Sequence, residues 1–160
     1  MVSLNVPPKR KTWQIGTMKT PPCGGYSKGA IKHLTAIGND IIVQWKVLNT
    51  NGHLFCKIAV SNGNTYLNTL GIENERSFIP LFPLDKSADS SGLFPCGLEN
   101  NAVEMKTVSM PPNFKCSNCI LQFSWRTSSD IYYSCADVSY PRNLFRYDNK
   151  TFCNTYIHYS

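Results

Sequence analysis

Apolar and polar residues alternate over several short stretches of the chain, and this pattern is typical of half-buried β-strands. Residues 41–47 (IIVQWKV) and 54–60 (LFCKIAV) are rich in β-branched and aromatic side chains, and both partly alternate. Residues 103–110 (VEMKTVSM) alternate throughout, and a pair of prolines follows them, at which a strand can end. We therefore predict strands in all three segments, with residues 49–52 forming a hairpin connection between the first two.

Two further strands are predicted in the last third of the chain. Residues 120–125 (ILQFSW) and 131–138 (IYYSCADV) flank the turn sequence RTSSD, and we expect them to form an antiparallel hairpin. Residues 62–101 are less regular, helical periodicity is nearly absent, and no repeat or domain boundary is evident. Short strands separated by turn residues over this length predict an all-β sandwich. The expected organisation is one domain of residues 1–160, in which residues 141–160 are a C-terminal extension.

The composition fits one globular domain with a polar surface. Of the 160 residues, 42% are hydrophobic and 16% are charged, so the chain can bury a sizeable core and is not of the disordered class. The net charge of +6 and the pI of about 9.0 come from scattered Lys and Arg, and only residues 9–11 form a basic run. No base-reading motif accompanies these charges, and no apolar stretch approaches the length of a membrane span. We therefore expect no nucleic-acid partner and no membrane span.

Seven cysteines in a chain of this length indicate disulfides and an oxidising compartment. They are Cys23, Cys56, Cys96, Cys116, Cys119, Cys135 and Cys153. The number is odd, so at least one thiol is free or pairs outside the chain. Only Cys116 and Cys119 have CxxC spacing, without the second ligand pair that a zinc site needs or the βαβ context of a thioredoxin-like redox motif.

Two local features bear on the location of the protein. The triplet that begins at Asn149 is a glycosylation sequon, which gives weak support to secretion. Residues 1–13 turn polar within a few positions and do not read as a signal peptide. A secreted, extracellular or cell-wall location is expected from the cysteines, with a virion as the alternative.

Several segments resemble a known family. NFKCSNCILQFSW followed by YYSCADVSY resembles the closing strands of the chitin-binding type-4 domain, which is the fold of lytic polysaccharide monooxygenases. The match is most similar to the animal and viral branch of that family. The opening MVSLNVPPKR, and CGGYSKGAI followed by IIVQWKVLNTNGHLFCKIAV, are similar to the first half of the family pattern. The resemblance covers most of residues 1–140, and the stretch from the CxxC to CADV is its most specific part.

The resemblance implies an immunoglobulin/fibronectin-III-like β-sandwich with disulfides and long loops. It also implies a copper site called the histidine brace. In the brace, an N-terminal His gives copper its amino group and a ring nitrogen, and a second His on the loop after a strand gives another ring nitrogen. An aromatic residue lies at the axial position. A flat, exposed site of this kind lets a crystalline polysaccharide reach the metal.

Carried over residue by residue, the family pattern predicts a brace that is broken at both ends. The first His falls on Met1. The second falls on Thr50, within the segment NTNGHL, and a hydroxyl is a poor copper ligand beside imidazole. The axial aromatic falls on Tyr132 and is retained. An ordinary core position on a strand is the alternative interpretation of Tyr132.

Other residues could still serve a metal or a glycan. His53 is a possible substitute ligand, whereas His33 and His158 are isolated in the sequence. The family's substrate loop is short here, and it carries Trp13 and Tyr26. Exposed aromatic rings stack on sugar rings, so these two residues are the glycan-binding candidates, with core positions as the alternative. We expect no cofactor, or copper if the brace has been rebuilt.

The predicted hairpin also suggests disulfide partners. Cys116 or Cys119 on one strand is expected near Cys135 on the next, although the sequence does not determine the connectivity. Cys153 lies beyond the resemblance and is expected to reach Cys96 or another chain.

Three functions remain open at this point. The first is a non-catalytic protein on the monooxygenase scaffold that binds chitin or a related β-glycan, or has a structural role. The second is an active copper monooxygenase that cleaves chitin oxidatively. The third is a structural subunit of a virion or an extracellular coat, with other subunits as partners. A hydrolase is not expected, because the ten acidic residues form no evident pair and no G-x-S-x-G motif occurs.

Overall fold

The structure of the chain is a computed structural model, and it describes residues 2–7, 9, 19–25, 28–34, 36–47, 54–62 and 78–141. The following residues singled out above lie outside these ranges: Met1, Trp13, Tyr26, Thr50, His53, Asn149, Cys153 and His158. Of the predicted C-terminal extension, residues 141–160, the structure describes residue 141 alone. Within the described ranges there is no helix of sufficient length and hydrophobicity to cross a bilayer.

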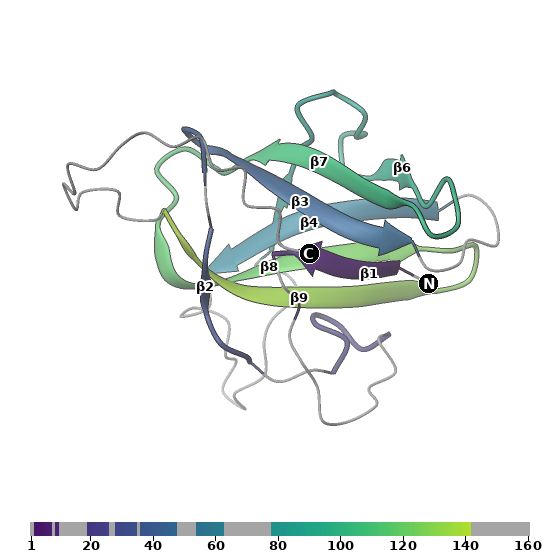
Figure 1. The fold of residues 1–160 in the computed structure, drawn as a ribbon, viewed down its shortest axis with the longest axis horizontal. Helices are drawn as coiled ribbons and strands as arrows, with labels where there is room; N and C mark the ends of the chain where they lie inside the picture. The colour runs from purple at the N-terminus through teal and green to yellow at the C-terminus, as the bar shows by residue number, and fades with distance from the viewer. Residues whose placement is uncertain are drawn as a thin grey trace.

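The described strands form two β-sheets that pack face to face (Figure 1). The three-stranded sheet has the order β1 (Val2–Val6), β3 (Asp40–Val47) and β7 (Val103–Ser109). The six-stranded sheet has the order β2 (Lys32–His33), β9 (Ile131–Tyr140), β8 (Cys116–Arg126), β4 (Leu54–Asn62) and β5 (Ile79–Leu81), with β6 (Phe94–Cys96) also paired to β4. All pairs are antiparallel except that of β2 with β9. The predicted all-β sandwich is confirmed.

The core lies between the two sheets and follows from the alternation in the sequence. In β3, every second residue from Ile41 to Val47 is buried, because successive side chains of a strand point to opposite faces. Trp45 of β3 stacks on Phe123 of β8, with ring centroids 4.8 Å apart. Burying each large apolar side chain contributes roughly 1.5–3 kcal/mol. The inward faces of both sheets therefore stabilise one shared core.

The strands predicted at 41–47, 54–60 and 103–110 and the hairpin of 120–125 with 131–138 are confirmed, with shifts of a few residues at their ends. The hairpin connection predicted at 49–52 is wrong. β3 pairs with β1 and β7, whereas β4 pairs with β8, β5 and β6, so the two strands belong to different sheets. Both strands have an apolar face to bury, and facing each other across the core buries both.

Strand β7 turns its apolar residues outward at one end. Val103 and Met105 are exposed, whereas Glu104 and Lys106 between them are partly buried. Lys106 pairs with Asp85, with a distance of 2.5 Å from Nζ to Oδ2, and lies 5.6 Å from the ring centroid of Phe94. Polar partners for the inward charged groups thus override the simple apolar pattern.

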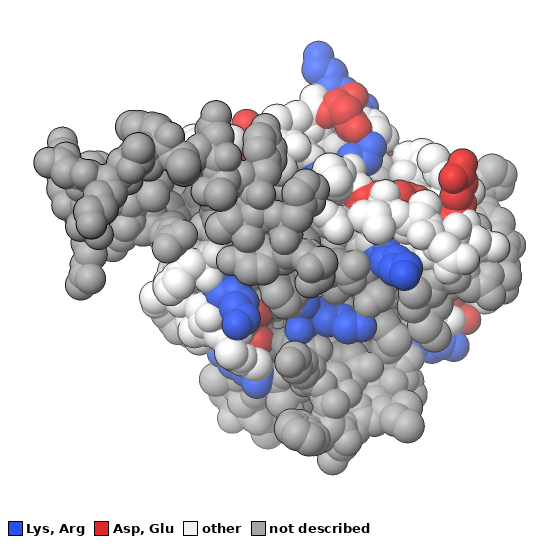
Figure 2. Space-filling view, viewed as in Figure 1, with Lys and Arg blue, Asp and Glu red and all other residues white. Residues whose placement is uncertain are grey.

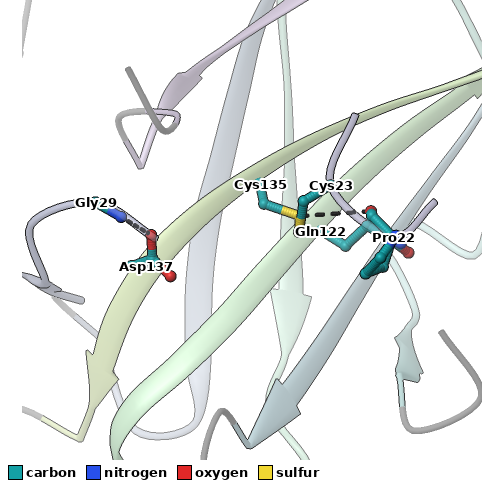
Figure 3. The surroundings of a disulfide bond; sticks show 6 residues. All are labelled: Pro22, Cys23, Gly29, Gln122, Cys135 and Asp137. Atoms are coloured by element: carbon teal, nitrogen blue, oxygen red, sulfur yellow. Dashed lines mark hydrogen bonds between the residues drawn. A yellow bond between two sulfur atoms is a disulfide. The ribbon is translucent and has the colours of Figure 1, made fainter. Parts of the chain in front are cut away.

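Three disulfides join six of the seven cysteines. Cys23 bonds to Cys135, Cys56 bonds to Cys96, and Cys116 bonds to Cys119. The first holds the segment of residues 19–25 against strand β9 (Figure 3). The Gln122 side chain supports the same attachment by donating a hydrogen bond of 2.8 Å to the carbonyl oxygen of Pro22.

This pairing differs from the expected one. Cys119 and Cys135 lie on neighbouring strands but point to opposite faces of the sheet. Cys119 belongs to the core between the sheets, whereas Cys135 packs with Cys23 and Ile120 on the outer face. A bond between Cys119 and Cys135 is therefore sterically excluded. Cys96 is likewise bonded to Cys56, so it does not serve as the partner of Cys153.

Asp137, which follows Cys135 and Ala136 in the CADV segment, has a structural role. It is 3% exposed, and its Oδ2 atom accepts a hydrogen bond of 2.7 Å from the backbone N–H of Gly29 (Figure 3). A buried carboxylate needs such donors, because it has lost its contact with water. Asp137 thereby ties residues 28–34, which include strand β2, to β9.

Removing a disulfide should destabilise the fold according to the length of chain that it closes. Cys23 and Cys135 are 112 residues apart, and Cys116 and Cys119 are 3 apart. The loop-entropy relation predicts a loss of about 4–5 kcal/mol for Cys23→Ala with Cys135→Ala, and of about 2 kcal/mol for Cys116→Ala with Cys119→Ala. Urea unfolding followed by tryptophan fluorescence measures both losses. Equal losses in the two double variants would contradict the prediction.

Candidate functional site at the loop end of the sandwich

Several chain segments meet at one end of the sandwich, on the right in Figure 1. Val2, in the first strand, pairs with Val47, the last residue of β3. Strand β4 begins next to the end of β8, because Phe55 pairs with Arg126. Strand β9 begins there too, since Arg126 pairs with Ile131. We call this end, where residues 48–53 connect β3 to β4, the loop end.

The family pattern assigned the brace positions to segments next to this end. Thr50 and His53 belong to the connection that leaves β3 after Val47, and Met1 precedes Val2 in the sequence. The described strands that flank these positions are therefore neighbours, as a brace requires. The three side chains themselves lie outside the described residues.

Tyr132 is the brace-associated residue that the structure does describe. Its ring is partly buried and stacks on Trp125, with centroids 5.5 Å apart and an angle of 11° between the planes. Trp125 in turn contacts Phe123 at 5.9 Å. Tyr132 therefore continues an aromatic cluster from the core toward the loop end. The core interpretation and the position expected for the axial residue are both compatible with this placement.

A lysine lies beside the ring of Tyr132. The Nζ atom of Lys19 is 5.5 Å from the Tyr132 ring centroid and 3.1 Å from Oδ1 of Asp130. The hydrogen bond and charge of Asp130 raise the pKa of Lys19 above its ordinary value, so the amine stays protonated at neutral pH. Lys19 is half exposed, so this pair contributes little to stability. It does place a positive charge beside the ring of Tyr132.

The one described histidine lies at the other end of the sandwich. His33 is opposite Ser139, near the end of β9, and its Nδ1 atom hydrogen-bonds the Ser139 hydroxyl. His33 is thus separated from the loop end by the length of β9. Among the described residues, no group of three His, Cys, Asp or Glu could hold a metal ion. A threonine hydroxyl, which the family pattern would place at the second brace position, is a poor replacement for an imidazole as a copper ligand.

Glu104 organises the described part of the loop end, and the sequence did not reveal this role. Its carboxylate accepts hydrogen bonds from the backbone N–H groups of Gly97 (3.0 Å) and Leu98 (2.9 Å) and from Nε1 of Trp45 (3.1 Å). One side chain thus fixes the turn after β6 and satisfies the buried indole. Only the pairing of β3 with β7 brings Glu104 opposite Trp45, so no local sequence signal marks it.

A second feature that sequence reasoning missed is a small cleft on the outer face of the six-stranded sheet. Its volume is about 80 Å³, and we call it the outer-face cleft. Its lining includes Lys57, Phe78, Gln122, Ser124, Arg126 and Tyr133. Alternation along β4, β8 and β9 identifies the outward positions once the core is known. It does not show which strands are neighbours.

Comparison with known proteins supports the fold. No protein-family model and no curated protein matches the sequence. Among solved structures, the chain is similar to the lytic polysaccharide monooxygenase AA15 from Thermobia domestica in the Cu(I) state, with a TM-score of 0.61 and 17% identity over 87% of this chain and 98% of that chain. At this identity the similarity establishes a common β-sandwich fold. LPMO10B from Micromonospora aurantiaca is a weaker match, with a TM-score of 0.45 and 14% identity over 72% of this chain and 57% of its own.

Replacing Glu104 should destabilise the loop end measurably. In Glu104→Gln, an amide N–H₂ group replaces one carboxylate oxygen. This donor would face an N–H group that now donates to that oxygen, so at least one hydrogen bond would be lost. We expect a loss of about 1–3 kcal/mol in the free energy of unfolding. Glu99→Gln is a matched control, because Glu99 is exposed, and its effect should stay within about 0.5 kcal/mol. Urea unfolding compares the two, and equal stability of both variants would contradict the role of Glu104.

Proposed function

We propose that this chain is a non-catalytic polysaccharide-binding protein on a lytic polysaccharide monooxygenase-like scaffold, with chitin or a related β-glycan as its ligand. One observation carries most of the proposal: the chain shares its fold with the Thermobia domestica monooxygenase over 98% of that protein, yet Thr50 stands at the position that the family pattern gives to the second copper histidine. A fold alone does not determine an activity. Loss of the metal ligands with retention of the sandwich is a route from an enzyme to a binding module.

The chemistry around the brace positions supports a role without copper. Copper in such a site requires nitrogen ligands, and Thr50 supplies a neutral hydroxyl. The ammonium group of Lys19 beside Tyr132 adds a positive charge that opposes binding of a second cation nearby. His33 is engaged at the far end of β9. His53 is the remaining candidate for a rebuilt ligand near the loop end, and we assign it no metal role.

The glycan contacts in this proposal are aromatic. Trp13 and Tyr26 are the candidates from the short substrate loop, and Phe55 at the loop end joins them because 46% of its surface is exposed. A flat aromatic face stacks on the apolar face of a sugar ring. The disulfides support an extracellular setting for this function, in line with the animal and viral branch of the family.

One observation favours a second candidate function, a structural subunit of an extracellular coat or a virion. The three disulfides use six of the seven cysteines, which leaves Cys153 without a cysteine partner in its own chain. A disulfide between subunits would give this thiol a partner. Such a subunit could have the same sandwich and the same altered brace. Glycan binding and the oligomeric state in solution therefore distinguish the two candidate functions.

Sedimentation with insoluble polysaccharides tests the proposed function. The oxidised chain should be depleted from solution by chitin and should release no oxidised oligosaccharides when a reductant is present. Cellulose serves as a second β-glycan, and the reduced, unfolded chain controls for non-specific adsorption. Absence of binding to any glycan, together with disulfide-linked oligomers in solution, would favour the coat subunit instead.

Copper calorimetry tests whether the brace has been lost. The chain as it stands should show no saturable one-to-one binding of Cu(II). A variant with Met1→His, presented with a free N-terminus, and Thr50→His should gain it, because two imidazoles and an amine restore the nitrogen ligands. Ser90→His adds an imidazole at an exposed turn and should not produce such a site. One-to-one copper binding by the unaltered chain that His53→Ala abolishes would support the monooxygenase alternative.

A further inference from the structure

The outer-face cleft has room for an acidic group. The share of liquid volume of one water is roughly 30 Å³, so a volume of about 80 Å³ corresponds to about three water molecules. A carboxylate or sulfate group is of this order of size, whereas a whole sugar ring is larger. Any glycan that uses the cleft would therefore insert a substituent while its ring remains on the surface.

Two positively charged side chains line the cleft. Phe55 pairs with Arg126 and Lys57 pairs with Ser124, so Lys57 and Arg126 are diagonal neighbours on one face of adjacent strands. Diagonal positions have side chains about 7–8 Å apart. Neither forms an ion pair with a described residue, and none of the described residues that line the cleft is acidic. An anion between the two cations would remove their repulsion and gain two charge-assisted contacts.

The walls of the cleft are held in place by other contacts. The aliphatic part of Lys57 lies over Gly92, where an added Cβ atom would be 3.7 Å from Cε of the lysine. Gln122 is fixed by its hydrogen bond to Pro22, in the segment that the Cys23–Cys135 disulfide attaches (Figure 3). A preformed site loses little conformational entropy when a ligand binds to it.

A stacking surface lies next to the cations. Phe55 is 46% exposed and pairs with the exposed Pro95 of β6 on one side and with Arg126 on the other. An exposed aromatic ring beside an arginine suits a sugar ring that carries an acidic substituent. On the face drawn in Figure 2, the described Lys and Arg form separate spots and no continuous basic stripe is visible among the described residues.

We propose that the outer-face cleft binds an acidic polysaccharide, with a carboxylate or sulfate group between Lys57 and Arg126 and a sugar ring stacked on Phe55. This inference rests on the proposed polysaccharide-binding function and adds to it a site for glycans that carry acidic groups. The planar guanidinium of Arg126 forms paired hydrogen bonds with carboxylates and sulfates alike. Separate probes therefore distinguish uronic acids from sulfate esters.

Calorimetric titration of the oxidised full-length chain tests the proposal. The probes are polygalacturonate, heparin, chitin oligosaccharides as neutral glycans, single-stranded DNA and polyglutamate. Lys57→Gln with Arg126→Gln should weaken binding of polygalacturonate or heparin by about tenfold or more. Lys46→Gln is the charge control, because Lys46 is exposed on the other sheet, and it should change affinity less than about twofold. Thermal unfolding checks that each variant remains folded.

A matched pair of variants tests the stacking contact of Phe55. Phe55 and Phe82 have the same exposed fraction, 46%, so Phe55→Ala and Phe82→Ala remove equally exposed rings. Only Phe55→Ala should weaken acidic-glycan binding, by about fivefold or more, as expected for the loss of one stacking contact.

Each outcome is decisive. Tight binding of an acidic glycan that the double variant loses and Lys46→Gln retains supports the proposal. Binding of chitin oligosaccharides alone, unchanged in the double variant, overturns it while leaving the proposed polysaccharide function intact. Equal affinity for DNA or polyglutamate overturns it in favour of a general polyanion site. Absence of binding to every glycan, with insoluble chitin also not retained, overturns both proposals.

Discussion

The contact between Trp45 and Phe123 is the interaction on which the rest of the structure depends. It joins β3 of one sheet to β8 of the other, with the ring centroids 4.8 Å apart and both side chains fully buried. A buried indole needs an acceptor, and Glu104 provides it while also fixing the turn after β6. The core and the loop end are therefore parts of the same packing arrangement.

The same packing arrangement accounts for the fold but does not determine the function. The sandwich places Val2 beside Val47, as a two-ended metal brace would need, whereas our proposal assigns no metal ligand to Met1 or Thr50. The outer face of the six-stranded sheet offers a different kind of surface, with Lys57, Arg126 and Phe55 close together. Binding chemistry can thus move to another face while the core is retained.

Much of the fold was predictable from local patterns, whereas most of the site was not. The alternation in β3 and β7 and the hairpin of β8 with β9 were correctly located, because a strand with one buried face has a period of two in its own sequence. The predicted β3–β4 hairpin failed because turn residues between two strands do not reveal whether the strands share a sheet. The sequence placed Cys116 or Cys119 near Cys135 but left the connectivity open, because the sequence does not show which face of the sheet a cysteine occupies.

By itself, the sequence determined the all-β class and the positions of the main strands, since each is a property of neighbouring residues. Only the tertiary structure decided that Cys23 reaches Cys135 across 112 residues and that Lys57 and Arg126 share one face. The physical reason is that strand register and sheet membership are fixed by the burial of both inward faces together. That condition involves residues far apart in the chain, so no local pattern expresses it.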